Sequence, residues 1–78
     1  MFYTSDMPEC KLTDLGTEYR GSQSSSTSGY TCSYWEGEYE DLQENFCRNP
    51  DGREGGPWCF VDEGDEEWEY CDVPFCKR

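Results

Sequence analysis

The 78-residue sequence has no histidine, and only six lysines and arginines stand against 18 aspartates and glutamates. The resulting formal net charge of -12 argues against a nucleic-acid-binding surface, because phosphates require a basic patch. It argues equally against docking on an anionic membrane surface. No apolar run approaches the roughly 20 residues of a membrane-spanning helix. We therefore expect no nucleic-acid partner and no membrane insertion.

Apolar residues are also scarce. Only 33% of the residues are hydrophobic, so disorder is the first hypothesis to test. Six cysteines and an aromatic content of 17% are unlike a solvated tail. A small, aromatic, cysteine-dense chain is typical of a secreted disulfide scaffold. The sequence therefore predicts a small disulfide-rich fold and an extracellular location, either secreted or in the ectodomain of a larger protein.

The cysteines have no spacing that favours another use. Zinc knuckles and redox motifs need close-paired cysteines or histidines, and both are absent. We expect three disulfides, no metal and no cofactor. Each disulfide is worth roughly 3–4 kcal/mol on the chain-entropy model. Spacing alone leaves all 15 possible pairings open. The six residues are Cys10, Cys32, Cys47, Cys59, Cys71 and Cys76.

Several segments are predicted to form loops. Residues 1–9 carry no pattern and no features of a signal peptide, so they are expected to form a flexible leader. The polar, low-complexity residues 21–29 predict an exposed loop held between two cysteines, with a linker or an O-glycosylated stretch as alternatives. The charged residues 36–45 are expected to form a solvated loop or one helical turn. Asn-Pro and Asp-Gly pairs within residues 48–52 predict a chain reversal.

Two short aromatic segments, residues 58–61 and 68–71, alternate with period two and flank the acidic residues 62–67. This pattern predicts a β-hairpin. The alternation places Trp58 and Phe60 on the face opposite the cysteine between them. If the register allows, three large rings should gather near the preceding turn.

Five blocks of sequence occur in the order and with the cysteine spacing of a known family. They are Tyr19-Arg20-Gly21, Thr27-Ser28-Gly29, Phe46-Cys47-Arg48-Asn49-Pro50-Asp51-Gly52, Gly56-Pro57-Trp58-Cys59-Phe60 and Trp68-Glu69-Tyr70-Cys71-Asp72-Val73-Pro74-Phe75-Cys76. Together they resemble a kringle domain. The resemblance implies a kringle-like, loop-dominated fold over residues 10–76 with short antiparallel β-ribbons, followed by a tail at residues 77–78. It also implies the disulfides Cys10–Cys76, Cys32–Cys59 and Cys47–Cys71. The segment from Trp35 to Cys47 is shorter than in familiar vertebrate kringles.

Kringle domains are binding modules, and their best-known site holds a lysine side chain between carboxylates and aromatic rings. By the resemblance, Asp51 matches the first carboxylate, whereas Arg53 stands where the second is expected. Glu67 stands where the family has an arginine of the cationic pole. The ring positions are matched by Trp58, Phe60 and Trp68. These positions imply a degenerate lysine-binding site that Arg53 closes by pairing with Asp51 or Glu67. The alternative is that the rings are packing residues.

We expect a monomeric, extracellular, non-catalytic module that binds a protein or peptide with a basic patch, in a salt-sensitive manner. Without histidine or a free thiol, the common nucleophilic machineries are absent, and we expect no enzyme activity.

Other functions stay open at this point. The chain is alternatively an autonomous secreted structural or signalling peptide, and Lys77-Arg78 then resembles a dibasic processing site. It is alternatively a calcium-binding module, because residues 62–67 offer many carboxylate oxygens on one turn. Tyr39, which lies among acidic residues, suits tyrosine sulfation in a secretory pathway.

Overall fold

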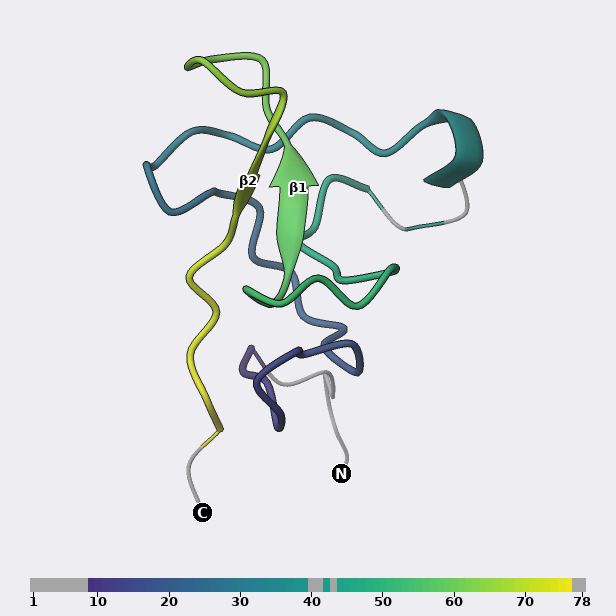
Figure 1. The fold of residues 1–78 in the computed structure, drawn as a ribbon, viewed down its shortest axis with the longest axis vertical. Helices are drawn as coiled ribbons and strands as arrows, with labels where there is room; N and C mark the ends of the chain where they lie inside the picture. Colours follow the sequence, from purple (N-terminus) through teal and green to yellow (C-terminus); the bar gives the residue numbers. More distant parts are fainter. Residues whose placement is uncertain (1–8, 40–41, 43, 77–78) are drawn as a thin grey trace, which may run out of the picture.

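The computed structural model describes residues 9–39, 42 and 44–76 (Figure 1). Its regular elements are one 3-10 helix, η1 (Gly37–Tyr39), and two strands, β1 (Trp58–Phe60) and β2 (Trp68–Tyr70). The remainder of this part of the chain is turns and irregular loops, so the predicted loop-dominated fold is confirmed. No helix within the described residues has the length and apolarity of a membrane span.

The two strands form the predicted hairpin. They pair antiparallel, with Trp58 opposite Tyr70 and Phe60 opposite Trp68. The acidic residues 62–67 connect them as an exposed loop at one end of the molecule (Figure 1). Each strand is one residue shorter than the aromatic pattern suggests.

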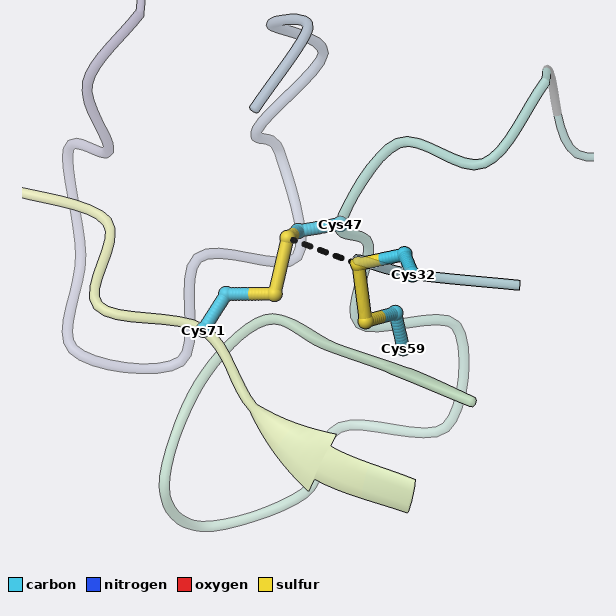
Figure 2. A group of neighbouring side chains, drawn as sticks. All are labelled: Cys32, Cys47, Cys59 and Cys71. Carbon is cyan, nitrogen blue, oxygen red and sulfur yellow. Dashed lines mark hydrogen bonds between the residues drawn. A yellow bond between two sulfur atoms is a disulfide. The ribbon is translucent and has the colours of Figure 1, made fainter. Parts of the chain in front are cut away.

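The three disulfides join Cys10 to Cys76, Cys32 to Cys59 and Cys47 to Cys71, which is the pairing that the kringle resemblance implies. The last two lie against each other at the centre of the domain, with 3.8 Å between the Sγ atoms of Cys32 and Cys47 (Figure 2). Both sulfurs are already bonded, so this approach is a packing contact.

The core is small and is built largely from these disulfides. Four of its nine buried hydrophobic residues are half-cystines. Trp58 is fully buried among them. Cross-links therefore occupy the place that aliphatic side chains fill in a larger domain. The nine residues are Tyr19, Cys32, Trp35, Cys47, Trp58, Cys59, Val61, Cys71 and Val73.

Residues 21–29 are not the simple exposed loop that their composition predicts. Ser26 is only 6% exposed. The backbone carbonyls of Gln23 and Ser24 accept hydrogen bonds from the amide groups of two core cysteines, at 2.7 and 2.9 Å. Small polar residues let the backbone approach the core closely, and backbone groups then make the contacts. The amino-acid composition of residues 21–29 describes their side chains, so it could not predict these backbone hydrogen bonds.

The predicted leader also needs a correction at its last residue. The Glu9 carboxylate accepts hydrogen bonds from the Ser22 amide at 2.8 Å and from the Tyr19 hydroxyl at 2.9 Å. Glu9 therefore belongs to the folded domain. The rest of the leader and the tail at residues 77–78 lie outside the described residues. The helical turn expected within residues 36–45 is present as η1.

Candidate functional site

Six aromatic rings form one continuous group, here called the ring cluster. Neighbouring ring centroids lie 4.9 to 6.0 Å apart, mostly with the edge of one ring on the face of the next. Such edge-to-face contacts add stabilisation beyond the burial of area. The hairpin contributes four of the rings, because alternation and register bring them to one face. The members are Trp35, Tyr39, Trp58, Phe60, Trp68 and Tyr70.

Trp35 and Tyr39 were not predicted as members of this cluster. They come from a segment without a strand pattern, and long-range folding brings them against the hairpin. The Trp35 indole Nε1 donates a hydrogen bond to the backbone oxygen of Phe46 at 2.8 Å, which fixes the ring. Tyr39, the candidate for sulfation, packs its ring 5.8 Å from Trp58.

The turn after Cys47 positions the charged residues of the site. The side-chain amide of Asn49 donates to the backbone oxygens of Leu15 and Arg53, at 2.7 and 3.0 Å. Its Oδ1 accepts from the Arg53 amide at 2.8 Å. Gly52 adopts a φ of 67°, in the left-handed region that glycine enters at little cost. Asn49 is itself buried, so this local network holds the turn in one geometry.

Arg53 lies over the ring cluster. Its guanidinium carbon is 3.6 Å from the ring centroid of Trp58 and 4.3 Å from that of Trp68. Its Nε donates to Asp51 Oδ2 at 3.0 Å. The other carboxylate oxygen, Asp51 Oδ1, accepts from the Trp58 indole Nε1 at 3.2 Å. The Arg53 guanidinium therefore contacts one carboxylate and two aromatic rings at once.

The structure thus places five of the six predicted site residues together. Asp51 and Arg53 form an ion pair over the rings of Trp58 and Trp68, and Phe60 packs 5.1 Å from Trp58. Glu67 is exposed, and no ion pair joins it to Arg53.

The depth of one ring was not predicted. Trp58 is 0% exposed, so its ring is not open to solvent while Arg53 lies over it. The Arg53 guanidinium and the neighbouring rings cover it. Phe60 and Trp68 are partly exposed and remain accessible from outside. Sequence alternation gave the face on which Trp58 lies, but not its depth.

Arg48, beside the site in sequence, has a structural role. It is 3% exposed, and its Nη1 donates to the backbone oxygens of Gly21 and Cys47, each at 2.7 Å. Burial lowers the pKa of this guanidinium, and Arg20 nearby adds to the effect. These two bonds join Gly21, at the start of residues 21–29, to the core at Cys47.

The described residues bring one group of potential metal ligands together, and that group is the four central half-cystines. Their sulfur atoms lie within 4.8 Å of one another but are consumed in disulfides (Figure 2). Within the described part of the chain, the carboxylates of residues 62–67 form no comparable convergent group.

Residues 36–76, more than half of the chain, match the family model of the kringle domain. The chain belongs to the kringle family. The matched range begins after Cys10 and Cys32, and the disulfides of these two residues extend the arrangement toward the amino-terminal end. Kringle domains are non-catalytic modules that bind proteins and are generally extracellular. In this kringle, Arg53 lies where the resemblance predicts a second carboxylate for a bound lysine.

Proposed function

We propose that this kringle is an extracellular, non-catalytic module that binds a protein or peptide partner through a basic side chain. The site is the trough formed by Asp51, Phe60 and Trp68 over the buried Trp58. The observation that supports it is the placement of Arg53. Its guanidinium makes the contacts that a lysine or arginine of a partner would make. Arg53 therefore acts as an internal occupant of the trough.

A partner has to displace Arg53, and the cost is modest. An ion pair at the surface contributes about 0–1 kcal/mol, and a partly exposed cation–π contact about 0.5–2 kcal/mol. The side chains of Arg53 and Asp51 are 26% and 40% exposed, so solvent screens their attraction. Internal occupation therefore weakens binding of an outside cation by about tenfold without preventing it.

The trough favours a basic side chain within a chain over free lysine. Free lysine carries its own carboxylate, and the family's cationic pole is replaced here by Glu67. In a domain with a net charge of -12, an added carboxylate is repelled. A lysine in the middle of a peptide has no free carboxylate and avoids this cost.

Tryptophan fluorescence tests the proposal. The wild-type domain, Arg53→Ala and Arg20→Ala are titrated with an amide-capped peptide containing one internal lysine, and with free lysine. Arg20→Ala removes the same charge from an exposed position away from the trough. We expect Arg53→Ala to bind the peptide about tenfold more tightly than the wild type. Arg20→Ala should match the wild type, and free lysine should bind weakly to all three proteins.

Absence of a response in Arg53→Ala overturns the proposal, provided that its thermal melt shows a folded protein. Equal gains in Arg53→Ala and Arg20→Ala also count against it, because they would show an effect of overall charge.

A further inference from the structure

A concave surface separate from the trough lies where residues 31–36 run beside the end of β1. It has a volume of about 640 Å³ and is here called the acidic groove. The residues that form the trough, Asp51, Phe60 and Trp68, do not line it, and neither does Arg53. The lining residues used below are Cys32, Ser33, Tyr34, Glu36, Asp62 and Glu63.

The walls of the acidic groove are held firmly. Cys32 pairs with Val61 as an isolated antiparallel bridge. The Ser33 amide donates a hydrogen bond to the backbone oxygen of Phe60 at 2.7 Å. The Cys32–Cys59 disulfide joins the same two segments covalently. The groove is therefore preformed, and a ligand does not have to order its walls.

The chemistry of the groove is that of a site for a cation on an apolar stem. Tyr34 is 64% exposed and lines the groove. Glu36, Asp62 and Glu63 are exposed carboxylates, and no lysine or arginine of the described residues pairs with them. An aromatic ring beside carboxylates suits a guanidinium or ammonium group and the methylenes that carry it.

The groove wall also has an unsatisfied polar group. The Oγ of Ser33 is buried and has no hydrogen-bond partner among the described residues. Unsatisfied buried hydroxyls are uncommon and call for an explanation, such as an ordered water or an ion. This observation is independent of the charge of the groove.

We infer that the acidic groove binds a lysine or arginine side chain from an extended basic segment of a protein partner. It is a second contact, lined by residues other than those that form the trough. The trough and the acidic groove differ in the free molecule. Arg53 occupies the trough, whereas no lysine or arginine of the described residues pairs with the carboxylates of the groove. An outside cation therefore meets no competing lysine or arginine of the described residues in the groove.

NMR titration with an acetylated, amidated Gly-Arg-Gly-Lys-Gly peptide tests this inference. We expect the backbone amide signals of Ser33, Tyr34 and Glu36 to shift in the wild-type domain. Glu36→Gln/Glu63→Gln should weaken the affinity measured from these signals by about fivefold. Asp14→Asn/Asp72→Asn removes the same charge from exposed positions outside the groove and should change it less than twofold. Tyr34→Ala should weaken binding without changing the charge.

Arg53→Ala separates this inference from the proposed function. It should alter the trough response and leave the shifts of the groove amides unchanged. Equal losses in the two double variants would overturn the groove as a site, because charge alone would then explain binding. Shifts of the groove amides with calcium chloride but not with the peptide would overturn it in favour of a metal site.

Discussion

The amino-terminal segment and the loop of the hairpin lie at opposite ends of the molecule (Figure 1). Their carboxylates make different contacts. At one end, residues 9–22 form the amino-terminal segment, in which Glu9 and Glu18 accept hydrogen bonds from backbone and hydroxyl groups. At the other end, residues 62–67 form the hairpin loop, in which every residue is exposed. No lysine or arginine of the described residues pairs with an acid of the hairpin loop.

In the amino-terminal segment, hydrogen bonds lower the pKa values of two acids. Hydrogen bonding from the Leu12 amide lowers the pKa of Glu18 from 4.5 to about 2, with further bonds from Thr13. Desolvation raises the pKa of Glu9, but bonds from Ser22 and Tyr19 outweigh it and leave the pKa lowered. In the amino-terminal segment, carboxylates satisfy amide groups that have no helix or sheet partner. In the hairpin loop, they remain available to solvent and to a partner.

Among the acids, substitution of Glu18 is expected to have the largest effect on the stability of the domain. Its Oε2 accepts from the Leu12 amide at 2.6 Å, and its Oε1 accepts from the Thr13 hydroxyl at 2.8 Å. Glu18→Gln turns one acceptor into a donor and should destabilise the domain by about 1–2 kcal/mol at pH 7. Thermal unfolding followed by circular dichroism measures this loss, with the exposed Asp14→Asn as control. Equal melting temperatures for the two variants would contradict the bonding role.

The same variant should show a defined pH dependence. The folded-state pKa of Glu18 is depressed, so its stabilisation is complete above pH 4.5 and is lost as pH falls toward about 2. The difference in melting temperature between wild type and Glu18→Gln should therefore shrink over this range. Melts at pH 7, 4 and 2.5 measure the trend. A difference that stays constant would show that the carboxylate charge is not responsible.

A smaller effect is expected at Glu69, between the two ends. Its carboxylate accepts from the Ser28 amide at 3.3 Å and from the Ser28 hydroxyl at 3.0 Å. Bonds from Ser26 and Ser28 lower its pKa. Glu69→Gln should reduce the melting temperature less than Glu18→Gln does. A larger reduction would show that the hairpin depends on residues 21–29 more than the amino-terminal segment depends on Glu18.

The smallest effect is expected in the hairpin loop. Asp65→Asn/Glu66→Gln removes two exposed charges from a strongly acidic domain and should change stability by less than about 0.5 kcal/mol. The direction should be toward higher stability, most clearly at low salt, because self-repulsion falls. Melts at two salt concentrations measure it. A clear loss of stability would show that these acids have partners of their own.

The features that the sequence predicts here are those with a short-range pattern. Period-two alternation predicts the hairpin, and the resulting register brings Phe60 opposite Trp68. The turn residues before β1 predict a reversal that carries Asp51 to the rings. The ion pair of Arg53 with Asp51 also follows from their proximity on that turn.

Other features depend on contacts between distant segments and have no local signal. The full burial of Trp58 requires Trp35 and Tyr39, which arrive from a separate loop. The bonds of Glu9 and of residues 21–29 run through backbone groups, which side-chain composition does not report. The pairing of cysteines came from the family resemblance, since spacing alone could not select it.

The contact between Cys32 and Cys47, at the centre of the domain, has a chemical consequence. These sulfurs belong to different disulfides and lie 3.8 Å apart. If a reductant opens one of these links, the freed thiolate is beside the sulfur of the other, where exchange can begin. A partly reduced molecule thus carries an internal route to scrambled connectivity, and brief exposure to thiols can trap misfolded isomers.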